Sequence, residues 1–197
     1  MDEVTKAEYV GCVKVISEYF LLPLLEELLE TFPFKILGFH SDNGSEYINH
    51  QVADMLKKML VDQTKSRSRR TNDNALVEGK NGAIVRKYMG YSHIPKDHAK
   101  RINTFYREYL NPYLNFHRYC GFATDYVNEK GKIKRKYETY MTPIQKLLTL
   151  SEYEKYLKEG ITKVGLLLET KRVTHFEAAK KVFVERQKLF REINRKI

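Results

Sequence analysis

Apolar residues in the first third of the chain alternate between short β-branched runs and helical spacing. Residues 9–16 (YVGCVKVI) are rich in β-branched side chains, which predicts a strand. Ser17 then offers a helix cap, and leucines at three- and four-residue spacing between Leu24 and Leu29 predict an amphipathic helix that ends at Pro33. The chain therefore opens with a strand followed by a helix.

The same order repeats directly afterwards. Residues 34–39 (FKILGF) predict a buried strand, residues 52–60 carry apolar side chains at helical spacing, and residues 61–64 are compatible with a further short strand. An alternation of strands and helices is typical of a layered α/β fold. We expect an α/β sheet flanked by helices.

The pattern changes at Lys65. The segment 65–74 (KSRSRRTNDN) is basic and has no apolar residue, which is the composition of a loop. Helical spacing resumes over 75–89 and again over 97–116, where Pro112 predicts a bend or a restart. We expect the aromatic residues of this last helix to lie in the core, although a platform for base stacking is an alternative.

A hairpin follows the helices. Residues 122–127 and 133–140 are strand-like and flank the turn sequence NEKG at 128–131. Thr142 and Pro143 then form a cap and first-position pair that predicts a short helix. Hairpin and helix together make a segment distinct from the preceding α/β part.

The tail is rich in Lys and Glu and ends in one long amphipathic helix. Its predicted apolar positions are Phe176, Ala179, Phe183, Phe190, Ile193 and Ile197. We expect this face to pack on the core or on another tail helix, with a dimer contact as the alternative. The sequence thus divides into an α/β part at 1–118, a hairpin with a short helix at 119–150 and a mostly helical C-terminal extension at 151–197.

Composition and charge narrow the class of partner. The 197 residues include 42% hydrophobic residues, enough for a packed core, and carry a net charge of +10. A basic chain of this kind favours a polyanion, nucleic acid first and an anionic membrane second. Neither a signal peptide nor an apolar run long enough to span a membrane is visible, so we expect a cytoplasmic, nucleoid-associated protein. Cys12 and Cys120 form no zinc-binding or disulfide pattern.

Two carboxylates stand out by their context. Asp42 follows the predicted strand 34–39 in the turn sequence SDNG, and Glu78 lies on the predicted helix 75–89, with 35 residues between them. Asp42 taken alone is an ordinary turn residue, and Glu78 an ordinary residue of a helix start. The C-terminal ends of buried strands, however, are where α/β proteins commonly place their chemistry.

The stretches GFHSDNGSEYIN and QTKSRSRRTNDNALVEGKNGAIVRKYMGY resemble the catalytic core of integrases and transposases of the D,D-35-E (DDE) class. The resemblance is close over about residues 8–92. It continues, similar in style, through FYREYLNPYLNFHRYCG and YMTPIQKLL, as in bacterial insertion-sequence transposases. It implies a ribonuclease-H-like fold, DNA integration and transposition, and Mg²⁺-dependent (or Mn²⁺-dependent) DNA strand cleavage and transfer. Within it, Asp42 and Glu78 match the second and third catalytic, metal-binding carboxylates.

This chemistry explains why carboxylates are needed. In-line displacement at a phosphodiester is assisted by two metal ions about 4 Å apart, and Mg²⁺ prefers hard oxygen ligands. We expect Asp42 and Glu78 to contribute to such a two-ion site. His40 more often packs or supports a ligand than binds the metal itself.

Basic residues are concentrated beside this predicted site. Between Thr64 and Arg101 the chain has ten basic and three acidic residues. The expected DNA-binding residues are Lys65, Arg67, Arg69, Arg70, Lys80, Asn81 and Arg86. Such residues would bind phosphates in a salt-dependent way, although a merely solubilising face is an alternative for the loop.

The class uses three carboxylates, and the first normally lies on the opening strand of the fold. Only 41 residues precede Asp42, so we expect the first strand and its Asp to lie upstream of Met1. Two hypotheses follow. The chain is a strand-transfer enzyme completed by an upstream segment or a separate chain, or it is a non-catalytic relic that binds DNA or a transposase. The expected partners are the DNA of element ends and target, and another copy of this chain or a full-length transposase.

Overall fold

The structure is a computed structural model that describes residues 1–41, 50–65 and 81–194. The chain divides into two compact units, which are described separately. Unit 1 consists of Met1–Tyr9 and Phe105–Gln187, and unit 2 consists of Val10–Thr104 and Lys188–Ile197.

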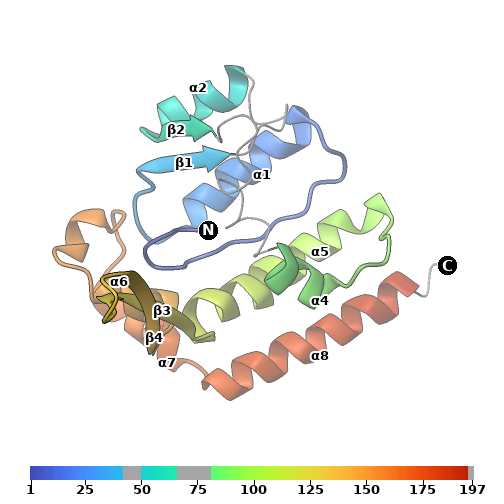
Figure 1. Cartoon of the computed structure of the whole chain (residues 1–197). Coiled ribbons are helices and arrows are strands. Elements are labelled where there is room, and N and C mark those ends of the chain that lie inside the picture. Colours follow the sequence, from blue (N-terminus) through green and yellow to red (C-terminus); the bar gives the residue numbers. More distant parts are fainter. Residues whose placement is uncertain (42–49, 66–80, 195–197) are drawn as a thin grey trace. The chain divides into compact units, whose positions relative to one another are not determined.

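The first half of unit 2 is a small α/β arrangement (Figure 1). Its elements are α1 (Glu18–Thr31), β1 (Gly38–Ser41), α2 (His50–Lys58) and β2 (Asp62–Lys65). The two strands pair in parallel, with Gly38 opposite Asp62 and Ser41 opposite Lys65. The predicted α/β class is confirmed at this level. The strand expected at 34–39 forms later, as β1. Its predicted burial is wrong, because only Ser41 of β1 is buried. The short strand expected at 61–64 forms as β2.

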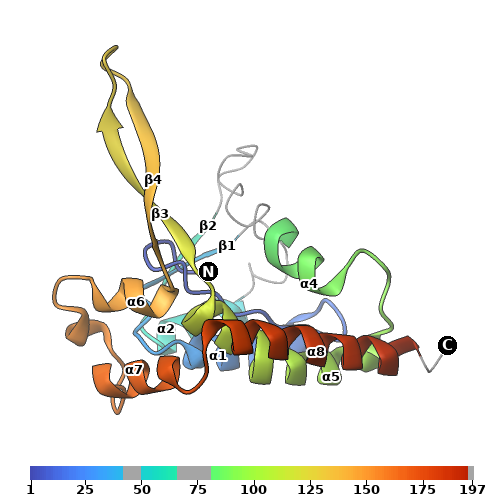
Figure 2. The same ribbon diagram turned by 90° about the horizontal axis from the view of Figure 1, so that it is seen from below.

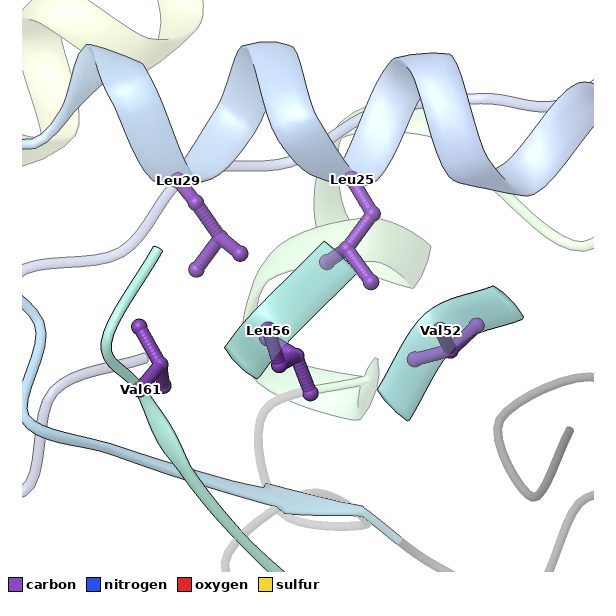
Figure 3. Close-up of a cluster of buried hydrophobic side chains, with 5 residues drawn as sticks. All are labelled: Leu25, Leu29, Val52, Leu56 and Val61. Atoms are coloured by element: carbon purple, nitrogen blue, oxygen red, sulfur yellow. The ribbon is translucent and has the colours of Figure 1, made fainter. Parts of the chain in front are cut away.

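A cluster of buried aliphatic side chains joins the helices of this arrangement to β2 (Figure 3). Leu25 and Leu29 extend from α1 toward α2, whose Val52 and Leu56 are fully buried, and Val61 closes the cluster beside β2. Burying each of these side chains stabilises the unit by about 1.5–3 kcal/mol relative to leaving it in water. The leucine spacing that predicted α1 therefore marks the face that holds α2 in place.

The prediction of a strand over 9–16 is wrong, because these residues form no strand. The backbone of Cys12 in this segment is instead paired by a side chain: Cys12 N donates to Asn103 Oδ1 at 2.7 Å, and Asn103 Nδ2 donates to the Cys12 carbonyl at 2.8 Å. A primary amide offers the same donor and acceptor as a neighbouring strand. One asparagine thus replaces a local strand partner.

The helix predicted over 75–89 is described from Asn81 onward. It consists there of a π-helical turn, η3 (Asn81–Arg86), and a short α4 (Lys87–Met89). Gly90 ends it with φ of +78°, a conformation that favours glycine. A short 3-10 turn, η4 (Lys96–His98), leads into α5 (Ala99–Phe105).

Proline 112 does not interrupt the helix that contains it. The chain continues from α5 through η5 (Tyr106–Leu110) and η6 (Tyr113–His117), with π-helical turns on both sides of Asn111 and Pro112. A π-helical turn changes the hydrogen-bond spacing, which accommodates a residue that lacks a backbone N–H. The helix therefore does not restart at Pro112, and the proline is accommodated by a change of helix type.

Unit 1 contains the predicted hairpin and short helix. β3 (Cys120–Val127) pairs antiparallel with β4 (Ile133–Met141), which confirms the hairpin. The short helix, α6 (Pro143–Leu148), begins with a capping box in which Gln145 N donates to Thr142 Oγ1 at 3.2 Å. Phe105 and Tyr106 are buried in this unit, as the core interpretation of the aromatic residues expects.

The tail is helical. Its elements are η7 (Tyr153–Tyr156), α7 (Lys163–Lys171) and α8 (His175–Asn194). The predicted apolar face of α8 is wrong in part, because Phe176 and Phe183 are 76% and 56% exposed. The buried positions are Ala178, Val182, Leu189 and Ile193. Two apolar stripes overlap on α8. The buried stripe carries Ala178 and Val182 in the first half of the helix, and the exposed stripe carries Phe176 and Phe183.

No helix in the described ranges is both long and apolar enough to cross a membrane. Cys12 and Cys120 are both half-buried free thiols.

Candidate functional site

The parallel pairing of β1 and β2 defines the candidate site. Because Ser41 lies opposite Lys65, the chain leaves both strands at the same edge of the sheet. Asp42 is the residue after Ser41 in the sequence, and the basic segment follows Lys65. The two sequence features that suggested chemistry thus begin from adjacent strand ends.

Most of the predicted site residues lie outside the described part of the chain. These are Asp42, Arg67, Arg69, Arg70, Glu78 and Lys80. Lys65 ends β2 and Asn81 begins η3, and these two are placed by their backbone alone. Arg86 is described in full.

A side-chain hydrogen bond links the two strands next to the shared edge. His40 Nδ1 lies 2.9 Å from Thr64 Oγ1, and the two residues are register partners. This bond fixes the orientation of the imidazole within the sheet. A hydrogen bond at Nδ1 suits a supporting role and a ligand role alike, so the expectation for His40 stays a prediction.

Arg86 lies on an exposed surface beside an aromatic ring. Its guanidinium carbon is 5.5 Å from the centre of the Tyr91 ring, and Tyr91 is 84% exposed. The turn at Gly90, whose N–H donates to the Arg86 carbonyl at 2.9 Å, brings the two side chains together. An exposed cation and ring can bind a phosphate and stack on a base or sugar. Sequence analysis missed Tyr91, and its only signal was a tyrosine directly after the helix-ending glycine.

The glycine on the described part of this helix also has open space around it. A Cβ atom added to Gly82 would have no described heavy atom within 4 Å. Among the described residues, therefore, no close packing requires glycine at this position.

The donor chemistry expected at the site is that of carboxylates. Within residues 1–41, 50–65 and 81–194, no group of three or more His, Cys, Asp or Glu side chains is arranged to hold a metal ion. The predicted ligands Asp42 and Glu78 fall in the two gaps between these ranges. Their carboxylate oxygens fit Mg²⁺ or Mn²⁺ by type.

Unit 1 contains a buried ion pair. The Glu8 carboxylate accepts a hydrogen bond from the Arg118 guanidinium, and the two side chains are only 7% and 18% exposed. The side chain of Asn115, on η6, forms two hydrogen bonds with the Glu8 backbone, and Arg118 directly follows η6. This cluster fastens the N-terminal segment to η6, and we assign it a structural role.

Comparison with known proteins gives a limited relationship. No family model matches the chain. An uncharacterized protein of Sinorhizobium fredii (strain NBRC 101917 / NGR234), y4rM, is 38% identical over 88 residues. The match covers 44% of this chain and 25% of that protein. The chain is therefore related, over less than half of its own length, to a quarter of a longer protein with no stated activity.

Proposed function

We propose that this chain contains part of the catalytic core of a DDE-class integrase or transposase and acts in DNA integration and transposition. The parallel β1–β2 pair is the observation that carries the proposal. It brings the strand end that precedes Asp42 next to the strand end that precedes the basic segment. A carboxylate at such a strand end and a neighbouring source of phosphate contacts are what DNA strand transfer requires.

In this proposal the small sheet of unit 2 is the remaining part of a ribonuclease-H-like sheet. The α/β order of α1, β1, α2 and β2 and the aliphatic cluster between the helices are in keeping with a layered sheet. The segment around Cys12, whose backbone is bonded to the side chain of Asn103, would belong to the same layered fold.

Asp42 and Glu78 are the proposed catalytic, metal-binding residues. When bound, Mg²⁺ or Mn²⁺ ions would activate the attacking oxygen and stabilise the leaving one. The basic residues between Lys65 and Arg86, together with Tyr91 beside Arg86, would hold the DNA backbone in place.

A second candidate function is DNA or transposase binding without catalysis. It rests on the basic residues between Thr64 and Arg101, which can bind phosphates whether or not a metal site is formed. The basic surface would then serve binding alone. The two candidates differ in whether Asp42 and Glu78 bind metal ions and are needed for DNA cleavage.

The deciding experiment measures metal binding and DNA cleavage on the same protein. Mn²⁺ binding by the full chain, followed by electron paramagnetic resonance, is compared with that of Asp42→Asn and Glu78→Gln variants, and Mg²⁺- or Mn²⁺-dependent nicking and strand transfer are assayed in parallel. The proposal expects each variant to lose Mn²⁺ affinity by about tenfold or more, since each removes a charged ligand. The exposed Asp54→Asn variant on α2 is the matched control and should bind Mn²⁺ like the unmodified chain. Unchanged Mn²⁺ binding in both ligand variants would refute the assignment and favour the non-catalytic candidate.

A further inference from the structure

The β3–β4 hairpin is a two-stranded ribbon with both faces in solvent. From Ala123 to Val127 and from Ile133 to Tyr140 every residue is exposed. Figure 2 shows the ribbon extending away from α6 and α7 of the same unit. Isolated two-stranded hairpins are marginally stable in water, so an exposed ribbon of this length needs stabilising contacts at its base.

The base of the ribbon supplies the anchor. Phe122 is buried, and the Lys146 ammonium lies 5.2 Å from the centre of its ring. The rings of Tyr137 and Tyr140 cover the backbone of Gly121, where a Cβ atom would lie 3.3 and 3.4 Å from them. Glycine at this position allows two aromatic rings to lie across the strand pair and stiffen it.

The tip of the ribbon is ordered by its own hydrogen bonds. Asn128 Oδ1 accepts from the backbone N–H groups of Lys130 at 3.1 Å and Lys132 at 2.9 Å. Gly131 adopts φ of +70°, which favours glycine. The predicted NEKG turn is thus a defined structure that fixes where the tip lysines begin.

The charge of the tip is strongly positive. Between Asn128 and Lys136 five residues are basic and one is acidic. Arg135 pairs with Asp125 at 3.5 Å and Lys136 pairs with Glu138 at 2.6 Å. Among the described residues no ion pair forms with the three remaining lysines, which are Lys130, Lys132 and Lys134.

The two faces of the ribbon differ. Lys134 lies directly opposite Tyr126, so one face carries a cation beside a half-exposed ring. On the other face Ile133 lies opposite Val127, and both side chains are more than half exposed. A cation with an aromatic neighbour suits the sugar-phosphate backbone, and small apolar side chains suit the methyl groups and steps of bases.

We propose that the β3–β4 hairpin is a DNA-binding arm, in which Lys130, Lys132 and Lys134 contact phosphates while the ribbon lies in a groove of duplex DNA. The major groove of B-DNA admits a two-stranded β-ribbon. The positive tip is complementary to a polyanion and would repel the same tip of a second copy. This arm is separate from the carboxylates of the proposed catalytic function and does not depend on them.

The test uses the full chain and a DNA duplex of about 30 base pairs without added metal ions, at several salt concentrations. In the test variant Lys130, Lys132 and Lys134 are all replaced by Ala. Its affinity should fall by about tenfold or more, and the slope of log affinity against log salt should decrease by about 0.9 for each lysine. A second variant with Arg at the same positions should keep both the affinity and the slope, because it keeps the charge.

A charge-matched control removes three exposed lysines elsewhere in unit 1. Lys155, Lys171 and Lys180 are replaced by Ala together, which lowers the net charge by the same amount. The arm is supported if this control loses much less affinity than the hairpin variant. Equal losses would show an effect of net charge alone and would overturn the proposal.

Two further measurements exclude other partners. Binding to vesicles that contain phosphatidylserine and sedimentation of the free protein are compared between the hairpin variant and the unmodified chain. A hairpin variant that loses vesicle binding, or changes its self-association, while DNA affinity stays the same would overturn the DNA assignment. Thermal unfolding confirms that the variants fold, and replacement by Gln serves if the Ala variant does not. Because no metal ion is present, failure here leaves the metal-binding test of Asp42 and Glu78 unaffected.

Discussion

The side-chain amide of Asn115 pairs with the backbone of Glu8 in the way that a neighbouring strand would. Glu8 N donates to Asn115 Oδ1 at 2.9 Å, and Asn115 Nδ2 donates to the Glu8 carbonyl at 2.8 Å. Asn115 is fully buried, and its Nδ2 also donates to the Asn111 carbonyl at 2.8 Å. The same two-bond pairing joins Asn103 to Cys12 in unit 2, at a half-buried position.

The first prediction concerns these two asparagines. Asn115→Ala removes the two bonds that its amide makes with the buried N–H and C=O of Glu8, and each lost bond to a buried group lowers the free energy of unfolding by about 1–3 kcal/mol. Asn103→Ala removes the same two bonds where water can replace them, so we expect a loss of about 1 kcal/mol. Urea unfolding followed by circular dichroism measures both. If both variants lose the same free energy of unfolding, burial does not strengthen the pairing of Asn115 with Glu8.

These asparagines also explain where prediction from sequence failed. The β-branched residues of 9–16 predicted a strand that does not form, because a strand also needs a backbone partner, which the pattern does not reveal. The partner is a side chain more than ninety positions away, on a helix where asparagine gives no distinctive signal. The spacing of apolar residues indicates the type of element and its buried face, but it does not indicate which backbone groups pair.

The helices and the hairpin were easier to predict because their signals are local. The NEKG turn and the Thr142-Pro143 cap specify their structures within a few residues. On α8 the helix was predictable but its buried face was not, since two apolar stripes compete and only packing selects the one with Val182 over the one with Phe183. At the candidate site the motif spacing selected Asp42 and Glu78, whereas Tyr91 depends on a turn that only the structure shows.

The second prediction concerns the end of α2. Leu60 is 88% exposed and has φ of +57°, and the bond from Val61 N to the Leu56 carbonyl at 2.9 Å closes the helix around it. A residue with a Cβ atom is strained in this left-handed conformation, whereas glycine is not. We expect Leu60→Gly to raise the free energy of unfolding by up to about 1 kcal/mol. Leu60→Ala keeps the Cβ atom and should change little; if both variants have the same stability, strain at this position is negligible.

The third prediction concerns pH and unit 1. His117 is buried, its Nδ1 lies 3.3 Å from Nδ1 of His175, and Tyr119 Oη lies 3.4 Å from the other ring nitrogen of His175. Burial, and next the charge of His175, lower the pKa of His117 from its ordinary value of 6.5, although Glu169 raises it in part. The unfolded chain therefore binds a proton more readily than the folded one in the window below 6.5.

The sign follows from that difference. Stability from a neutral His117 is complete above its unfolded pKa and declines as pH falls through the window between 6.5 and the lowered folded pKa. We expect the thermal midpoint to fall between about pH 7.5 and about pH 5.5, and to fall less in His117→Gln, which cannot be protonated there. The same pH dependence in both proteins would assign the effect to other groups.

The last prediction concerns the basic segment after β2. Arg67, Arg69 and Arg70 lie outside the described residues, but they follow Lys65, which ends a strand at the edge shared with Ser41. If they bind phosphates there, replacing all three by Ala should weaken binding to duplex DNA of any sequence and decrease the salt slope by about 0.9 for each phosphate that is no longer neutralised. Replacement by Lys should restore most of both quantities, since a point charge suffices to bind a phosphate. An unchanged salt slope in the Ala variant would refute the phosphate contacts and leave the segment as a solubilising face. A combination of this variant with the hairpin variant should lose affinity additively if the two surfaces bind separate phosphates.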